Sequence, residues 1–503
     1  MRHARALLLG SAAALATATV LRLPGAWASG NALNHVSGAW IALAEDLAHG
    51  TFYRALSEPG LGYGGTRFFP LAFALHGALR ASGADLLASG YALSLAAGAL
   101  LALGVFLLVR AAGLATPAAA AFGALAFAGF ATQHALASVR GDLLPVALSA
   151  LGLAAVARAP ARGRGAAAAA FLFALAFAAK PTALTAPAAA AAWLALRGER
   201  RLALGLALLT AAGAIAVVLV TDVLSEGRFL AILAATATGG AGSRDLLRGP
   251  IRLAEHLLIA DPAAIVLGGS AGLVALVALP ARLRAARAGQ AEPALLGALW
   301  LLAAGAGALV VFASPGTGVN HLVELEAAAA VALGTAWAGA SGAARLARAL
   351  APAAAVAGVW VAIGMAREDG RTARIREVHQ VAAALPAGGR VLSEDPLVPL
   401  VAGGRPEVLD PWMLRLAAQA DPALARPLID DLRGGAFDAV VLFQDLDSPD
   451  SEPWYARGNL GTPVVEAVRS AYRLAERHGR YRIYLPVTDR ARAGPLASAP
   501  PRG

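Results

Sequence analysis

The chain has no cysteine among its 503 residues, a single lysine (Lys180) and few charged residues of any kind. The absence of cysteine excludes disulfide bonds and thiolate chemistry, and it leaves the redox compartment undetermined. Charged residues make up 15% of the chain, whereas soluble domains carry roughly 25%. The chain also lacks a G-x-x-x-x-G-K-[ST] loop, and its C-terminal part lacks a G-x-G-x-x-G motif that opens a helix. A nucleotide-binding role therefore has no support in the sequence.

Hydrophobic residues, in contrast, make up 58% of the chain and are gathered in long runs. A run of about 20 such residues crosses the hydrocarbon core of a bilayer, and shorter runs extend into their flanking loops. The sequence therefore predicts an α-helical polytopic membrane protein. About eleven transmembrane helices are expected, at the N-terminal run and at 84–109, 117–137, 143–157, 166–178, 183–196, 202–220, 263–279, 294–313, 322–338 and 350–365.

The positive charge follows the membrane topology. The formal net charge is +10, but most arginines lie in alternate short loops, on the side of Arg2 and Arg5, so we expect no nucleic-acid partner. This pattern places the N-terminus in the cytoplasm of a multi-pass inner-membrane protein and its C-terminal part outside. Ala26-Trp27-Ala28 resembles a signal-peptidase site. We favour a retained first span, because Arg22 can extend its charge to the far interface.

The composition changes after the last span and predicts three regions. Residues 1–366 form the transmembrane domain, with a large first outer loop at 27–83, residues 367–486 form a small extracytoplasmic α/β domain, and residues 487–503 form a disordered tail. Within the α/β domain we expect helices at 371–385, 421–433 and 464–478, and strands at 390–393, 439–443 and 482–485.

The first outer loop combines an amphipathic helix with a glycine-rich turn. Val36, Trp40, Leu43 and Leu47 recur at helical spacing, which predicts a helix lying in the membrane–water interface. His35, Glu45 and His49 lie off this stripe, and three residues of this helix are candidates for catalysis: His35, Glu45 and Asp46. Glu45 and Asp46 point about 100° apart on a helix, so both cannot face one substrate. The following loop at 60–65 can approach a ligand, with Tyr63 and Arg67 as substrate-binding candidates.

Two later sites interrupt apolar runs with charge. The first is Ser138-Val139-Arg140-Gly141-Asp142. We interpret it either as a local Arg140–Asp142 ion pair or as a cavity where Asp142 is catalytic and Arg140 contacts substrate. The second is Lys180-Pro181, which suits a phosphate, because a compact ammonium occurs only here in a chain that otherwise uses arginine.

A third polar group lies at the start of a late span. Asn320 and Glu324 are four residues apart and share a helical face, with His321 between them. All three are candidates for substrate binding, although such a histidine is also a common packing residue. The acidic residues Asp445, Asp447, Asp450 and Glu452 leave room for a divalent metal such as calcium, but their spacing favours a solvated loop.

In their order along the chain these pieces resemble the GT-C glycosyltransferases, a class that includes protein O-mannosyltransferases and the aminoarabinose transferase of lipid A. The resemblance covers roughly residues 5–365. It depends on a first-loop helix ending A-x-x-L-x-x-G before a tyrosine, a Tyr/Gly/Pro stretch at 63–70, R-x-D, K-P and N-x-x-x-E. The matching residues are Ala44, Leu47, Gly50, Tyr53, Arg140, Asp142, Lys180, Pro181, Asn320 and Glu324.

The resemblance implies transfer of a sugar from a polyprenyl-phosphate-linked donor to a glycan, lipid or protein acceptor on the extracytoplasmic face. Members of the class carry a catalytic acidic residue near the start of the first-loop helix, where this chain has Val36. The general base is therefore open among His35, Glu45, Asp46 and Asp142. Two other functions fit a polytopic protein with an outer domain: a lipid or glycan flippase, and a non-catalytic membrane assembly protein.

Overall fold

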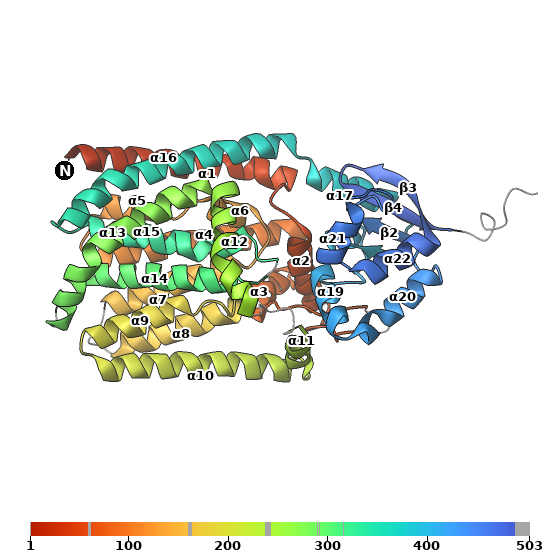
Figure 1. Cartoon of the computed structure of the whole chain (residues 1–503), viewed down its shortest axis with the longest axis horizontal. Coiled ribbons are helices and arrows are strands. Elements are labelled where there is room, and N and C mark those ends of the chain that lie inside the picture. Colours follow the sequence, from red (N-terminus) through yellow and green to blue (C-terminus); the bar gives the residue numbers. More distant parts are fainter. Residues whose placement is uncertain are drawn as a thin grey trace, which may run out of the picture.

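Figure 1 shows the computed structural model, in which a helix bundle meets a smaller α/β unit. The structure describes residues 2–58, 62–158, 163–236, 243–288, 290, 292–314 and 316–487. Gly60 and Leu61 of the predicted glycine-rich loop lie outside the described residues, as does the predicted tail from residue 488. We call the end of the bundle that meets the α/β unit the junction end.

Each of the predicted apolar runs contains a helix. Six helices of the described chain are long and apolar enough to cross a membrane, and a seventh span is counted if α5 and α6, bent by 81°, are taken together. The bundle consists of α1 (Arg2–Ser29), α4 (Leu86–Ala111), α5 (Thr116–Leu125), α6 (Phe130–Ala137), α7 (Leu143–Arg158), α8 (Gly163–Ala179), α9 (Thr185–Leu196), α10 (Arg200–Leu224), α13 (Pro262–Arg287), α14 (Pro293–Val311), α15 (Val323–Trp337) and α16 (Gly342–Arg371).

Small residues let these helices pack closely, and the outer helices also turn large apolar side chains outward. Residues 327–333 of α15 form an almost uninterrupted buried run of alanine, valine and leucine at the centre of the bundle. On the outer helix α10, Leu204, Leu208 and Ile215 are each about 60% exposed. Exposed leucine and isoleucine side chains of this kind are typical of a helix that faces lipid, because the acyl chains around it are also apolar.

Short elements close the junction end of the bundle. They are α2 (His35–Ala48), α3 (Pro70–Ala81), α11 (Arg228–Thr236), α12 (Ser243–Ile259) and the 3-10 turn η2 (Val319–His321). Asn34 begins α2 with a capping box, in which its side chain accepts from the backbone N–H of Ser37 and the Ser37 side chain pairs with the Asn34 backbone N–H. The predicted helix is therefore present.

The setting of α2 differs from the predicted interfacial helix. Residues 37–44 are all buried, because α3 covers one side of the helix and α18 (Leu397–Val401) of the α/β unit approaches the other. A side chain at Gly38 would collide with the backbone of Leu397. The glycine thus lets the two regions meet in close contact, so α2 is a buried part of the junction.

The α/β unit contains a four-stranded sheet in the order β1-β2-β4-β3. β1 (Val391–Ser393) and β2 (Ala439–Leu442) are parallel, and β4 (Tyr481–Pro486) runs antiparallel to β2 and to β3 (Tyr472–His478). These bounds confirm the three predicted strands. The remaining helices are α17 (Arg374–Ala384), α19 (Pro411–Ala420), η3 (Pro422–Ala425), α20 (Arg426–Arg433), α21 (Ser451–Arg457) and α22 (Thr462–Ala471).

One predicted helix of this unit is partly wrong. The expected helix at 464–478 ends at Ala471, and the next seven residues form β3. Gly479, at φ +54°, makes the turn that folds β3 back onto β4, and Tyr472 pairs with Pro486 at the far end. Pairing with a neighbouring strand overrides the modest helix propensity of this segment, a tertiary effect that is not visible in local sequence.

Candidate functional site

Three side chains that are far apart in the sequence meet at Asp142. This residue lies between α6 and α7, while Lys180 follows α8 and Asn320 belongs to η2. The Lys180 ammonium donates to Asp142 Oδ1 at 2.9 Å, and the Asn320 amide donates to the same oxygen at 3.0 Å. Because α8 contacts α3, the cluster lies at the junction end. The structure therefore brings the R-x-D, K-P and N-x-x-x-E segments to one place.

Arg140 supplies a second cation to Asp142. Its Nε lies 2.9 Å from Asp142 Oδ2, which makes an ion pair by distance, although the angles are not those of a hydrogen bond. Burial alone would raise the pKa of Asp142, but the charges of Lys180 and Arg140 outweigh burial and hold the pKa well below its usual range. Asp142 is therefore a buried carboxylate that stays ionised because two cations surround it.

A cavity of about 50 Å³ opens beside this cluster. Asp142, Lys180, Asn320, His321 and Glu324 all line it, so five of the predicted site residues share one space. Apolar residues of α7 and α14 form much of the remaining wall. The Lys180 side chain remains 21% exposed, so its ammonium can reach a molecule bound in the cavity.

Glu324 and His321 bound the cavity on the side of η2 and α15. Glu324 Oε1 accepts from the hydroxyl of Thr185 and from the indole of Trp300, the latter at 3.1 Å. Burial, with the nearby charges of Lys180 and Arg140, lowers the pKa of His321 well below its ordinary value, although Asp142 opposes this shift. The imidazole is therefore neutral and can accept or donate a hydrogen bond.

Sequence reasoning missed several polar residues that belong to this cavity. Ser149, Thr182 and Thr185 line it, and Trp300 contacts it through Glu324. The two threonines follow Lys180-Pro181 within five residues, so their proximity to the lysine is a signal that was available. Ser149 and Trp300 lie inside apolar helices, where nothing in the local pattern separates them from packing residues.

Asp46 lies outside this cavity, in a buried cluster at the junction. Arg54 donates two hydrogen bonds to its carboxylate, at 2.6 and 2.9 Å, and Arg405 of the α/β unit donates another at 2.7 Å. Arg54 also donates to the Pro406 carbonyl at 2.6 Å. The carboxylate therefore connects the first loop to the α/β unit.

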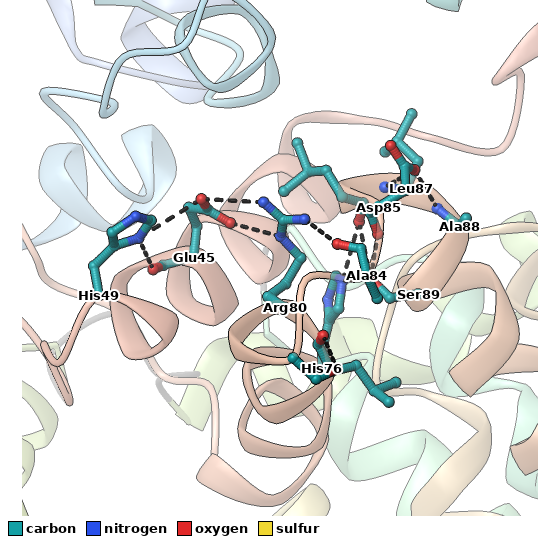
Figure 2. A network of polar contacts seen from close by, with 12 residues as sticks. Glu45, His49, His76, Arg80, Ala84, Asp85, Leu87, Ala88 and Ser89 are labelled. Carbon is teal, nitrogen blue, oxygen red and sulfur yellow. Dashed lines mark hydrogen bonds and ion pairs between the residues drawn. The ribbon is translucent and has the colours of Figure 1, made fainter.

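Glu45 faces another direction, as its place next to Asp46 on the helix predicted. Figure 2 shows its carboxylate turned toward Arg80, whose Nε lies 2.8 Å from Glu45 Oε2, with His49 on the other side. The hydrogen bond from Arg80 lowers the pKa of Glu45. Arg80 also donates to the Ala84 carbonyl, so Glu45 fixes the link between α3 and α4.

His35 lies between the Asp142 cluster and the α/β unit. Burial lowers the pKa of His35 to about 4; the charges of Arg374 and Arg140 act in the same direction, and Asp395 acts against them. The next part of α2 contacts the loop before Arg140, because the Ser37 and Ser138 hydroxyls lie 3.1 Å apart. His35 thus neighbours the cluster but does not line its cavity.

Tyr63 and Arg67 are placed on the α/β side of the site. The backbone of Tyr63 pairs with Glu407 and Leu409, and its ring is buried in the core of the α/β unit, where burial and Asp410 raise its pKa. Arg67 is exposed, yet its charge is near enough to help lower the pKa of His321 and to oppose the rise that burial causes in the pKa of Asp410. Tyr63 therefore holds the loop in place, while Arg67 lies near His321, which lines the cavity.

Metal ligands do not gather in the described part of the chain. Among these residues, no group of three or more histidines, aspartates and glutamates is arranged to hold an ion. Asp445, the first residue of the predicted acidic run, instead pairs with Arg477 at 2.5 Å.

No protein-family model and no curated protein sequence matches the chain, but solved structures do. ArnT from Cupriavidus metallidurans bound to undecaprenyl phosphate aligns with a TM-score of 0.56 at 16% identity, over 96% of this chain and 98% of that chain. The archaeal oligosaccharyltransferase AglB from Archaeoglobus fulgidus, in complex with an inhibitory peptide and a dolichol-phosphate, aligns with a TM-score of 0.54 at 13% identity, over 96% and 74%.

These alignments extend over nearly the whole chain, including the α/β unit, and identity this low shows a shared fold rather than shared chemistry. The resemblance seen in the sequence is thereby confirmed for the architecture: the chain has the fold of the GT-C membrane glycosyltransferases.

Proposed function

We propose that this chain is an integral membrane glycosyltransferase that moves a sugar from a polyprenyl-phosphate-linked donor to an acceptor on the extracytoplasmic face. The observation that carries the proposal is the meeting of Arg140, Asp142, Lys180 and Asn320 beside one cavity. The bound lipids of the two structural neighbours, undecaprenyl phosphate and dolichol-phosphate, are of the same chemical class as the proposed donor.

Lys180 is the proposed phosphate ligand. Its ammonium is partly exposed at the cavity and now contacts Asp142, so a donor phosphate would compete with this carboxylate for the same cation. A fixed cation stabilises the negative charge that develops on a departing phosphate. Arg140 and Arg67, whose charges both act on His321, would add to the positive potential around Lys180.

Asp142 is the proposed proton acceptor, because it is the cavity carboxylate closest to the proposed phosphate position. When the phosphate takes Lys180, Asp142 loses its strongest cation and its pKa rises toward the ordinary range, which makes it a better base. The acceptor O–H proton passes to the carboxylate, and the acceptor oxygen attacks the anomeric carbon. The carbon–oxygen bond to phosphate breaks, and polyprenyl phosphate leaves with the electron pair and an inverted centre behind it.

The polar residues around the cavity are proposed to hold the donor sugar. Asn320 and Glu324 offer an amide and a carboxylate to its hydroxyl groups, and neutral His321 can orient one of them. Glu45 and Asp46 contact arginines away from the cavity, so we assign them to the support of the junction.

The proposed sidedness depends on the arginine pattern. The loops rich in arginine lie at the end of the bundle opposite the junction, as expected for a cytoplasmic N-terminus with the α/β unit outside. The acceptor would then approach the cavity from the outer side of an inner membrane. The shorter helices α7, α8, α9 and α15 would complete the eleven crossings expected from the sequence.

The test is Lys180→Ala in the full chain. We expect purified protein to lose its affinity for undecaprenyl phosphate, and sugar transfer in membranes to fall on the order of 100-fold or more. Lys180→Arg should retain part of the binding, and Arg201→Ala, which removes an exposed arginine of α10, should leave both measurements unchanged. Undiminished transfer by well-folded Lys180→Ala protein would refute the assignment.

A further inference from the structure

A second and larger cavity lies between the junction ends of α1 and α16. It measures about 410 Å³, and none of its lining residues belongs to the cavity beside Asp142. In Figure 1 these two helices lie side by side along one flank of the bundle and end next to α17. We call this space the α1/α16 groove; the residues that matter for its chemistry are Arg22, Gly25, Ser29, Asp369, Gly370 and Arg376.

A buried arginine with unused donor capacity forms the floor of the groove. Arg22 is 4% exposed, and its Nε donates to Asp369 at 2.6 Å while one terminal nitrogen donates to the Gln133 carbonyl at 3.3 Å. The other nitrogen, Nη2, has no hydrogen-bond partner among the described residues. An unsatisfied guanidinium nitrogen is costly in a buried place, so this geometry fits an acceptor that arrives from outside the chain.

The open space above Arg22 is created by two glycines. A side chain built at Gly25 of α1 or at Gly370 of α16 would meet no atom of the described chain within 4 Å. At the rim, exposed Arg376 adds a second cation. Arg22 and Arg376 carry two positive charges and Asp369 carries one negative charge, so the lining of the groove has a net charge of about +1. This favours a ligand with a single negative charge.

The groove lies at the depth of lipid headgroups. Arg22 follows Arg5 by 17 positions on one helix, a rise of about 25 Å, which is close to the hydrocarbon thickness. Beside it on α1, Leu21 is 74% and Val20 is 62% exposed. Such a surface faces acyl chains, so a lipid that lies along it would bring its headgroup to the groove.

We propose that the α1/α16 groove binds the phosphate of an anionic membrane phospholipid. The Arg22 side chain is 1% exposed, so it turns toward the groove when a phosphate binds. The phosphate oxygens then accept from Arg376 and from Arg22 Nη2, the headgroup fills the space over Gly25 and Gly370, and the acyl chains cover Leu21 and Val20. Asn31, which donates to Asp369 at 3.0 Å, connects the groove to the segment that enters α2. Lipid binding would therefore stabilise the junction without contact with the proposed transfer site.

The experiment measures thermal unfolding of the full chain in detergent with added phosphatidylglycerol or phosphatidylcholine. We expect phosphatidylglycerol to raise the unfolding temperature by a few degrees more than phosphatidylcholine does. Gly25→Leu fills the groove at a helical position where leucine is favoured, and it should abolish this difference. Gly10→Leu is the matched control on α1, because the space around Gly10 is also open but lies outside the groove.

A second pair of variants tests the charge. Arg376→Gln should reduce the response to phosphatidylglycerol, whereas Arg367→Gln, an exposed arginine of α16 outside the groove, should not. Equal stabilisation by both phospholipids, or a full response from Gly25→Leu, would overturn the proposal. It would also be overturned if inorganic phosphate reproduced the effect, or if undecaprenyl phosphate alone produced an effect that Gly25→Leu removes.

Discussion

Asp46 and Asp142 are both buried carboxylates held between two cations, yet their surroundings give them different roles. Asp46 forms ion pairs with Arg54 of the first loop and with Arg405 of the α/β unit. Asp142 is held by Arg140 and by Lys180, whose side chain also lines a cavity. The number of ion pairs is equal at the two carboxylates, so the open space beside one partner is what distinguishes them.

That difference decides whether a cation can exchange its partner. The Arg54 side chain is 1% exposed and is also tied to the Pro406 carbonyl, so no ligand can replace Asp46. Lys180 is a point charge on a flexible stem at the edge of a cavity, and an incoming anion can take its ammonium without unfolding anything. Asp46 therefore always keeps a buried partner in Arg54, although its second partner, Arg405, lies at the surface, whereas the accessible cation beside Asp142 faces a cavity.

The largest effect that separates the two carboxylates is expected from Asp142→Asn. This change removes the proposed proton acceptor, so transfer should fall on the order of 100-fold or more. It also removes the anion that competes for Lys180, so the affinity for undecaprenyl phosphate should stay equal or increase. Transfer is followed in membranes, and binding is followed on purified protein.

Two results would contradict this reasoning. Full transfer by Asp142→Asn would show that the proton goes elsewhere, and Glu324→Gln would then be the next variant to examine. Lost affinity for undecaprenyl phosphate, in protein with normal thermal stability, would show that Asp142 positions Lys180 and does not compete with phosphate.

Asp46→Asn should act on stability. It leaves buried Arg54 without its carboxylate, and removal of one partner of a buried pair costs about 3 to 5 kcal/mol. Arg405→Gln is the matched control on the other side of the same carboxylate: its side chain is 42% exposed, so its loss should cost about 1 kcal/mol or less. Chemical denaturation measures both changes.

Binding of undecaprenyl phosphate per folded molecule should be unchanged in Asp46→Asn. A variant with normal stability and no transfer would place Asp46 in the chemistry, against the structural role that its contacts indicate.

The sequence predicted most of the helical architecture because the signals there are long and local. Apolar runs and arginine placement predicted the bundle, and short segments that look like buried strands predicted three of the four strands. β3 could not be predicted, because Tyr472–His478 becomes a strand only by pairing with β4. The burial of α2 was missed for a similar reason, since its second cover is α18, about 350 positions later.

The sequence identified which residues belong to the candidate site, but it did not show which of them contact one another. Lys180 stood out as the single lysine, and Arg140 and Asp142 stood out as charges that interrupt an apolar run. Nothing in the sequence shows that Lys180 and Asp142, which are 38 positions apart, meet in the fold. Arg54 and Arg405 were not among the candidate residues, although their ion pairs with Asp46 give that carboxylate its structural role at the junction. Arg22 was read as an interfacial anchor, and its pair with Asp369, 347 positions away, is visible only in three dimensions.

The smallest expected effect concerns pH at the boundary between the two regions. The pKa of His35 is about 4 in the folded chain, against 6.5 when it is unperturbed. Between these values the unfolded chain binds a proton that the folded chain excludes, so stability falls as the pH drops from about 6.5 to about 4, and this contribution is constant below and above that window. The shift arises from burial and from Arg374 and Arg140, which outweigh Asp395.

His35→Asn removes this proton and should reduce the loss of unfolding temperature between pH 7 and pH 4.5 by a few degrees. His49→Asn is the matched control, since that histidine ends the same helix with 67% of its side chain exposed and should leave the pH dependence unchanged. An identical acid response in wild type and His35→Asn would show that protonation of His35 does not destabilise the junction. Because Asp142 stays ionised through the same window, a response that disappears with His35 belongs to the junction and not to the cavity cluster.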